Sequence, residues 1–385
     1  MNRRSCLKSF AALGATTTLS TALGASRSAA AAASKPSTPR SSAAAACNVA
    51  LKRLMLRHTW TTTMSSSAYR DTVNVRYQRD GITGYGEGAP IIRYDETPEK
   101  ALKAIEAILP QIAAGDPKKF DKLLAEVRSS LGEGEHAAMA AVDIAICDWI
   151  TKRLGIPLYE YFGLDRKDAP VTTFSIGIDT PEITRQKTLE AADYPVLKVK
   201  VGLKTDEATI EAIRSVTKKP LRVDANEGWT DKEEAIRKIN WLETQGVELI
   251  EQPMPAHMFE ETKYVRSKVH LPIIADEACT SAAMIARLPE AYDGVNVKLD
   301  KAGGVMESYR WIKMARAFNL KVMLGCMVSS SCSCTAAAHL SPLVDYPDLD
   351  GNLLIANDPF VGVKVEKGKL ILPTGPGLGL KLVAV

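Results

Sequence analysis

Residues 221–252, LRVDANEGWTDKEEAIRKINWLETQGVELIEQ, contain the pattern that decides the fold of this chain. The stretch opens with the short apolar run LRVDA, continues through an amphipathic helical segment at 231–244, and closes with a second short run, VELIEQ. Thr230 and Glu233 have the spacing of a capping box, so we expect the helix to begin there. A strand, a helix and a second strand in so short a stretch predict two parallel strands joined by a helix.

The same unit recurs on both sides of this stretch. Further short, β-branched runs stand at 196–201, 272–276, 294–299 and 320–325, and a helical pattern fills 207–218. Six strands in series, alternating with helices and without a nucleotide-type glycine loop, predict a (β/α) barrel.

The chain before about residue 170 follows a different pattern. Apolar and polar residues alternate at 49–57 and 72–77, and helical periodicity follows at 98–113, 120–131 and 136–154. Strands followed by helices, without alternation, predict a small α+β domain.

Charged residues stand at the carboxyl ends of five successive barrel strands, where a buried strand should not tolerate them. They are Lys200, Asp224, Glu251, Asp276 and Lys298. In a parallel barrel these strand ends surround the active site, so we expect the five side chains to meet in one pocket. Buried charges need partners, and the two signs supply them.

The three carboxylates are hard oxygen ligands, which suit Mg²⁺ better than zinc. The two lysines would flank the metal, and a lysine that acts as a base needs a pKa lowered toward the working pH. Lys198 lies two residues before Lys200 and points to the same face of the strand, so like-charge proximity is expected to lower the pKa of both.

Five motifs carry a resemblance to a known family. They are LKVKVG at 197–202, DAN at 224–226, EQPMP at 251–255, ADE at 275–277 and NVKLDKAGG at 296–304. In this order and spacing they resemble the barrel-strand motifs of the dipeptide epimerase branch of the enolase superfamily, in the muconate-lactonizing-like subgroup. GYGEGAP at 84–90 and AAVDIAICD at 140–148 extend the resemblance over nearly everything from about residue 49.

The resemblance implies a (β/α)₇β barrel, a TIM-like α/β fold, with an N-terminal α+β capping domain. It also implies an isomerase in which Mg²⁺, held by Asp224, Glu251 and Asp276, binds the substrate carboxylate and stabilises an enediolate. Lys200 and Lys298, on opposite faces of the α-carbon, would remove and return the proton of the C-terminal residue of an L,L-dipeptide.

The resemblance also implies the groups that hold the rest of the substrate. Lys198 would lie near the substrate carboxylate as an electrostatic helper. Asp348 and Asp350, in PDLDG, match the aspartate pair that holds the α-ammonium group, although Asp and Gly would also suit a plain turn at this position.

One position departs from the pattern of epimerases that act on Ala-Glu. Those enzymes carry an arginine in the cap loop, and here the loop at 58–69 has Ser65 at that place. Trp60, Met64 and Tyr69 in the same loop suggest an apolar or permissive pocket, unless they only pack against the barrel rim. Across the pocket, GCMVSSS at 325–331 places Met327 and Ser329 where they could select the side chain.

Two other functions fit parts of this pattern. A muconate cycloisomerase or an o-succinylbenzoate synthase would share the metal triad and the paired lysines but needs no ammonium clamp. A non-catalytic, exported peptide-binding protein would need the clamp but not both lysines.

The domain organisation follows from these patterns. Residues 1–46 are expected to be a twin-arginine signal peptide, with Arg3 and Arg4, and a low-complexity linker, which would make the protein periplasmic. The capping domain is expected at 47–168, the catalytic barrel at 169–358, and a C-terminal segment that returns to the cap at 359–385.

The composition excludes other classes. The net charge of +4 comes with no basic stripe, so no nucleic-acid partner is expected. The apolar run of the leader is too short and too rich in threonine to span a membrane. The seven cysteines show no zinc or redox spacing, although export would permit a disulfide. Whether the chain forms a homo-oligomer is left open.

Overall fold

The computed structural model describes residues 45–383, which belong to one compact unit. The predicted twin-arginine motif and nearly all of the linker lie outside these residues. Within the described range, no helix combines the length and the apolar character needed to cross a membrane. The cysteines of this range are all free thiols, so the disulfide that export would permit does not form among them.

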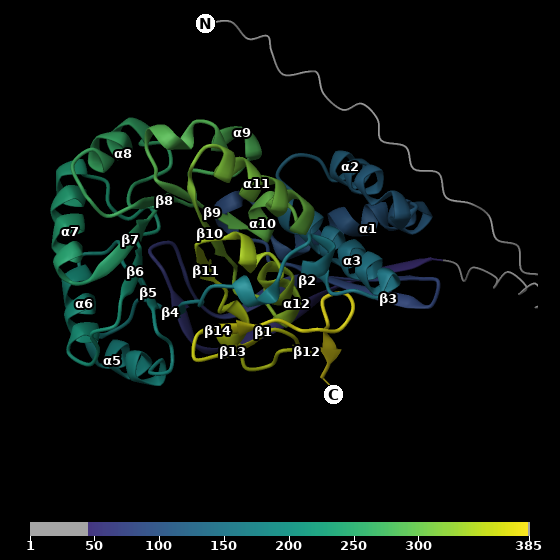
Figure 1. The fold of residues 1–385 in the computed structure, drawn as a ribbon, viewed down its shortest axis with the longest axis horizontal. Coiled ribbons are helices and arrows are strands. Elements are labelled where there is room, and N and C mark those ends of the chain that lie inside the picture. Colours follow the sequence, from purple (N-terminus) through teal and green to yellow (C-terminus); the bar gives the residue numbers. More distant parts are fainter. Residues whose placement is uncertain (1–44, 384–385) are drawn as a thin grey trace, which may run out of the picture. The chain divides into compact units, whose positions relative to one another are not determined.

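The capping domain combines an antiparallel sheet with three helices, as predicted (Figure 1). Its strands are β1 (Ala46–Thr61), β2 (Ser66–Arg79) and β3 (Ile82–Gly88), and its helices are α1 (Pro98–Ala114), α2 (Phe120–Leu131) and α3 (His136–Leu154). β1 and β2 run beyond the predicted strands because pairing continues to Thr61 and Ser66. The loop expected at 58–69 is therefore only the four-residue tip of a long hairpin.

Glycines on β3 let helix α3 lie directly against the sheet. Gly84, Gly86 and Gly88 recur at every second residue, so all three face α3. A Cβ at any of them would collide with a backbone carbonyl of α3. This close contact explains why α3 is buried along most of its length.

The second part of the chain is a parallel barrel of eight strands, which run in sequence order around the sheet. They are β4 (Phe174–Ile176), β5 (Leu197–Lys200), β6 (Leu221–Asp224), β7 (Val247–Glu251), β8 (Ile273–Ala275), β9 (Gly294–Lys298), β10 (Lys321–Gly325) and β11 (Tyr346–Asp348). The six predicted strands are all present. β4 and β11 were missed because each has only three residues and carries polar residues or proline.

Side chains join the two ends of this sheet. β4 and β11 stand at opposite ends of the strand order. Thr173 Oγ1 donates to Asp348 Oδ1 at 2.5 Å, and the Ser175 amide donates to Asp350 Oδ2 at 2.6 Å. The nearly closed barrel is therefore completed by the aspartate pair of the PDLDG segment.

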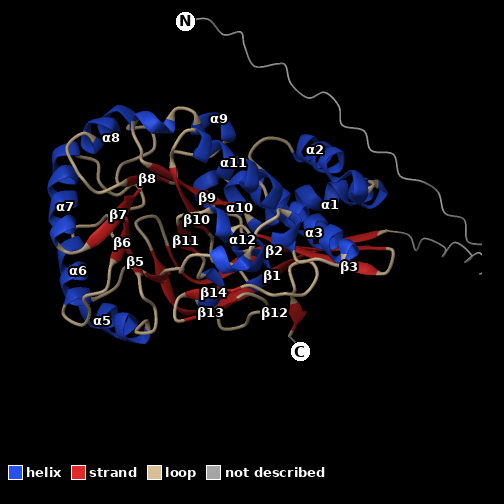
Figure 2. Ribbon diagram, in the orientation of Figure 1, coloured by secondary structure: helices blue, strands red, loops and turns tan. Residues whose placement is uncertain are grey.

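Helices surround the barrel strands, as Figure 2 shows in blue around red. They are α5 (Pro181–Glu190), α6 (Asp206–Arg214), α7 (Lys232–Thr244), α8 (Phe259–Arg266), α9 (Ala282–Ile285), α11 (Val305–Ala317) and α12 (Ser331–Ala338), with short α4 (Leu158–Tyr161) and α10 (Leu299–Ala302). The predicted capping box on α7 is wrong. Asp231 is the cap, and its carboxylate accepts from the Glu234 amide at 2.8 Å. Its backbone is extended, so its side chain reaches the first turn, whereas Thr230 lies one residue too early.

The C-terminal segment forms two small antiparallel pairs. β12 (Phe360–Val361) pairs with β15 (Lys381–Leu382), and β13 (Lys364–Glu366) pairs with β14 (Lys369–Ile371). The Leu378 amide donates to Asp148 Oδ1 on α3 at 2.8 Å. The ring of Phe360 lies edge-on to Tyr85 on β3, with centroids 5.5 Å apart. These contacts bring the end of the chain back to the capping domain.

Candidate active site

The charged residues predicted at the strand ends come together in the structure. Lys198 and Lys200 lie on β5, Asp224 ends β6, Glu251 ends β7, Asp276 follows β8, Lys298 ends β9 and Asp348 ends β11. Each of these residues has at most 8% of its surface exposed. The parallel register pairs Lys200 with Asp224 and Asp224 with Glu251, so neighbouring strands end at the same level.

Three carboxylates form a group that could hold a metal ion. Asp224, Glu251 and Asp276 each offer an oxygen within 4.8 Å of the others, and all are buried. One oxygen of Glu251 is fixed by Asn296 Nδ2 at 2.6 Å, while Oε2 has no hydrogen bond of suitable geometry. Three carboxylate oxygens this close together suit a hard divalent cation such as Mg²⁺. The hydrogen bond from Asn296 fixes the orientation of the Glu251 carboxylate.

The lysines lie directly beside these carboxylates. Lys198 Nζ is 2.7 Å from Glu251 Oε2 and 3.2 Å from Asp224 Oδ2. Lys200 Nζ is 2.5 Å from Asp224 Oδ2, and Lys298 Nζ is 2.7 Å from Asp276 Oδ2. Lys200 comes from β5 and Lys298 from β9, so these two lysines approach the three carboxylates from different strands.

The pKa of Lys198 does not follow the sequence prediction. Burial by itself lowers the pKa of Lys198, but the carboxylates of Asp348, Glu251 and Asp224 more than reverse this and raise it well above the ordinary value. The pKa of Lys298 is raised in the same way by Asp276 and Glu251, against burial and against Lys198. Lys198 thus lowers the pKa of Lys298, a residue for which no like-charge effect of Lys198 was predicted, but anions in direct contact outweigh it.

Charged side chains that the sequence prediction missed complete the cluster. Lys301 is fully buried and binds Asp276 Oδ1 at 2.5 Å. Glu277 accepts from Asn226 Nδ2 at 3.2 Å, and burial and the neighbouring Asp276 raise its pKa to about 8. Lys301 and Glu277 are part of the motifs NVKLDKAGG and ADE, so their position next to the strand ends was the available signal.

Asp348 and Asp350 form a buried acidic pair beside the lysines. Lys198 Nζ lies 2.6 Å from Asp348 Oδ2, and burial together with Asp348 raises the pKa of Asp350 to about 7. A cation bound here would relieve the repulsion between the two carboxyl groups. The pair is therefore more than a turn, because both side chains point into the barrel and face the cavity.

A cavity of about 470 Å³ lies between this cluster and the cap. Lys198, Lys200, Lys298, Asp348 and Asp350 line it from the barrel side. The cap covers it with the β1–β2 hairpin, whose Thr63 Oγ1 donates to Asn226 O at 2.8 Å.

The predicted specificity residues divide into two groups. Ser65, at the exposed tip of the hairpin, and Met327 line the cavity. Ser329 does not, so its predicted role in selecting a side chain is wrong. Its hydroxyl is fully buried and binds Met327 O at 3.2 Å and Cys334 Sγ at 3.4 Å, because the chain turns inward there to start α12.

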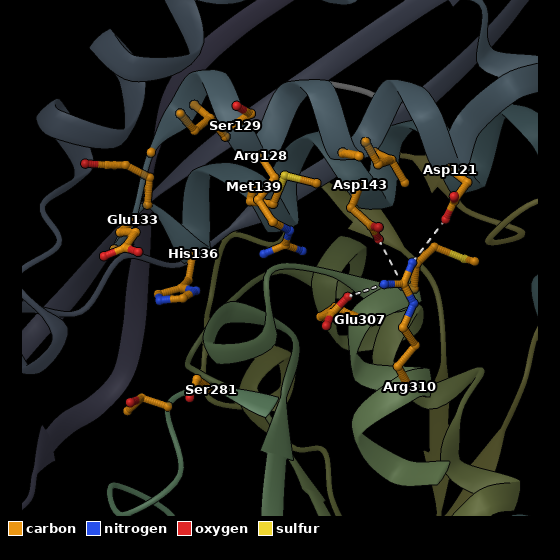
Figure 3. A pocket seen from close by; sticks show the side chains of 18 of the residues that line it. Asp121, Arg128, Ser129, Glu133, His136, Met139, Asp143, Ser281, Glu307 and Arg310 are labelled. Carbon is orange, nitrogen blue, oxygen red and sulfur yellow. Dashed lines mark hydrogen bonds and ion pairs between the residues drawn. The ribbon is translucent and has the colours of Figure 1, made fainter. Parts of the chain in front are cut away.

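A larger hollow of about 910 Å³ lies elsewhere, among α2, α3 and α11 (Figure 3). Arg310 is one of its charged lining residues and binds Asp121 at 3.1 Å and Glu307 at 3.2 Å. None of the lysines or carboxylates described above lines this hollow. Size alone therefore does not mark the site, whereas convergent charge does.

A parallel barrel with three carboxylates and paired lysines at its strand ends, covered by an α+β cap, defines the enolase class of enzymes. The family described as "Mandelate racemase / muconate lactonizing enzyme, N-terminal domain" matches residues 44–163, and "Enolase C-terminal domain-like" matches residues 183–384. The chain belongs to this family of the enolase superfamily.

Relatives within the family have been named by activity. The L-Ala-D/L-Glu epimerase of Bacteroides thetaiotaomicron is 42% identical over 329 residues, which are 85% of each chain. The L-Ala-D/L-amino acid epimerase of Pedosphaera parvula is 41% identical and covers 86% of this chain and 97% of its own. A solved dipeptide epimerase from Enterococcus faecalis, in complex with Mg and L-Leu-L-Tyr, is 32% identical with a TM-score of 0.82, over 87% of this chain and 98% of that one.

Proposed function

We propose that this chain is a Mg²⁺-dependent dipeptide epimerase, an isomerase that inverts the α-carbon of the C-terminal residue of an L,L-dipeptide. The observation that carries the proposal is the position of two lysines, Lys200 and Lys298, on either side of one carboxylate trio and facing one cavity. The named activities of the relatives support it.

The residues of this chain divide the work in a simple way. Lys200 and Lys298 take and return the α-proton, and two bases on separate strands give inversion. When bound to Asp224, Glu251 and Asp276, Mg²⁺ would supply positive charge for the substrate carboxylate and so make the α-proton more acidic. Lys198 adds a further positive charge beside the trio.

The acidic pair orients the other end of the substrate. Asp348 and Asp350 are buried carboxylates within reach of the cavity, and a substrate α-ammonium group is the cation that would compensate them. A muconate cycloisomerase or an o-succinylbenzoate synthase has no use for such a clamp. A peptide-binding protein without catalysis has no use for two lysines in contact with a metal-ligand trio.

The test is proton exchange in D₂O. The protein is incubated with Mg²⁺ and a pool of L,L-dipeptides, and mass spectrometry follows deuterium at the C-terminal α-carbon together with growth of the L,D form. We expect both signals from at least one dipeptide. A pool that acquires no deuterium would contradict the proposed function.

Asp350 offers the sharper variant for separating the alternatives. Asp348 also binds Lys198, whereas the Asp350 carboxylate accepts its hydrogen bond from the Ser175 amide. Asp350→Asn keeps an oxygen for that amide and removes the charge. Dipeptide turnover should fall by about 10-fold or more, since one charge-assisted contact is lost. Unchanged turnover would favour a substrate without an ammonium group.

We further propose that the protein is exported to the periplasm. The adjacent Arg3 and Arg4, followed by an uncharged apolar run, support this proposal. Cell fractionation of a tagged chain should place it with periplasmic markers, and Arg3→Lys combined with Arg4→Lys should retain it in the cytoplasm. Equal distribution of both forms would contradict a twin-arginine signal.

A further inference from the structure

Most of the positively charged side chains that line the cavity form ion pairs with carboxylates, but one does not among the described residues. Lys198, Lys200 and Lys298 contact the carboxylates described above, and Arg93 binds Glu227 through two bonds of 2.7 and 2.9 Å. Arg70 is the remaining cation of the lining, and within residues 45–383 no ion pair to its guanidinium is formed.

Arg70 is held in the cavity wall without a hydrogen-bond acceptor. It lies on β2 opposite Leu54 of β1, and its Nε is buried and makes no hydrogen bond. Burial lowers the pKa of Arg70, and the adjacent Asp71 only partly opposes this. The carboxylate of Asp71 is itself bound by both arms of Arg53 at 2.8 Å. A partly buried guanidinium whose Nε has no acceptor is costly unless a ligand supplies one.

Strand alternation places the side chains of Arg70 and Asp71 on opposite faces of β2. On one face of β2, Asp71 binds Arg53, and the Arg53 guanidinium lies 4.0 Å from the centre of the Tyr69 ring. Residues one position apart on a strand point to opposite faces, so Arg70 leaves β2 on the face opposite Tyr69 and Asp71, although these two residues line the same cavity. Thr72 follows on the Arg70 face and is fully buried.

The same contacts bear on the prediction of an apolar or permissive pocket. The ring of Tyr69 lines the cavity and is also in contact with the Arg53 guanidinium. Trp60 packs against Leu54, Val328 and Ile355 in a small cluster of its own. These two aromatic residues therefore have partners within the protein, whereas the guanidinium of Arg70 has none among residues 45–383.

The four bonds of the reacting α-carbon show what Arg70 would meet. Under the proposed function, the carboxylate is directed to the trio, the hydrogen to one of the lysines, and the peptide nitrogen toward the acidic pair. Only the side chain is left. The wall that has no part of the substrate assigned to it comprises the cap hairpin with Arg70, the loop at 90–98, and Met327 with Val328. A guanidinium fork matches a carboxylate in charge and geometry better than it matches any neutral group.

We propose, on the basis of the proposed function, that Arg70 binds a carboxylate on the side chain of the substrate's C-terminal residue. The preferred substrates are then dipeptides that end in glutamate or aspartate. Recognition comes from strand β2 of the cap and not from Ser65, the loop position at which the sequence lacks an arginine.

The test compares two dipeptides of similar length and different charge. L-Ala-L-Glu and L-Ala-L-Met are assayed separately by deuterium exchange in D₂O with Mg²⁺, for the unchanged protein and for Arg70→Met, Arg70→Lys and Arg53→Met. Arg70→Met should lower kcat/KM for L-Ala-L-Glu by about 10- to 100-fold, the worth of one charged hydrogen-bonding contact. Turnover of L-Ala-L-Met should change by less than about threefold, because an apolar side chain makes no such contact.

The other variants act as controls. Arg70→Lys should restore part of the L-Ala-L-Glu activity, since a point charge replaces the fork. Arg53→Met, the same change at a hairpin arginine that does not line the cavity, should leave the ratio between the two dipeptides unaltered. Continued turnover of L-Ala-L-Met also shows that the Arg70 variants are folded.

Three results would overturn the inference while the proposed function stands. They are a preference of the unchanged protein for L-Ala-L-Met, an equal loss for both dipeptides in Arg70→Met, and no loss for L-Ala-L-Glu in that variant. Absence of exchange from every dipeptide would instead overturn the proposed function itself, and this inference with it.

Discussion

Glu87, on cap strand β3, holds the first turn of barrel helix α12, and replacing it tests how the cap fixes the cavity wall. Its Oε2 accepts from Ser330 Oγ at 2.5 Å, from the Ser330 amide at 3.1 Å and from the Ser333 amide at 3.2 Å. The segment just before α12 carries Met327, which lines the cavity. Glu87→Ala removes every one of these acceptors from a fully buried place.

The expected cost follows from the donors left behind. Two backbone amides lose their partner, and each buried donor without one costs about 1–3 kcal/mol. Stability should therefore fall by about 2–6 kcal/mol in Glu87→Ala. Glu87→Gln keeps an oxygen at the Oε2 position and should cost only about 1 kcal/mol.

The effect of pH separates charge from hydrogen bonding. Burial raises the pKa of Glu87, and the bonds from Ser330 and Ser333 only partly oppose this. A carboxyl group whose pKa is higher in the folded than in the unfolded protein loses stabilising effect as pH rises toward the folded value. Glutamine does not titrate, so the difference between Glu87→Gln and the unchanged protein should shrink as pH rises.

Urea unfolding followed by circular dichroism gives the stability differences, with exposed Glu366→Ala as a matched control that should stay within about 0.5 kcal/mol. Hydrogen exchange should show faster exchange at the amides of Ser330 and Ser333 in Glu87→Ala. A loss below about 1 kcal/mol, or exchange at these amides as slow as in the unchanged protein, would refute the reasoning.

Three further outcomes are expected. Lys200→Ala and Lys298→Ala should each lower epimerisation by about 10²-fold or more. One variant should keep deuterium exchange only from the L,L form and the other only from the L,D form. Identical behaviour of the two variants with both forms would contradict two separate bases. Chelation by EDTA should stop exchange, and Asp224→Asn should raise the Mg²⁺ concentration needed by about 10-fold or more in a metal titration; exchange that persists in EDTA would contradict a metal role. Gly86→Ala should lower stability by about 1–3 kcal/mol, because its methyl group would meet the backbone of α3. Gly375→Ala should be neutral in the same urea unfolding assay, because the added methyl group would meet only the Gly379 Cα, at an ordinary contact distance of 3.8 Å.

The sequence alone determined the barrel and the residues that meet at its mouth. The strand and helix periods are local properties, and charged residues at the ends of β5 to β9 stand out because buried strands rarely contain them. Once the strands were assigned, parallel geometry required Lys200, Asp224 and Glu251 to converge.

Only the tertiary structure decided which charges are compensated. Whether Arg70 has a partner, whether Ser329 faces the cavity, and whether the pKa of Lys198 is raised or lowered all depend on segments far apart in the chain that pack together. Asp348, which joins β11 to the region before β4 and also binds Lys198, is the plainest case. Local patterns determine where a side chain begins, but the groups it meets come from the fold as a whole.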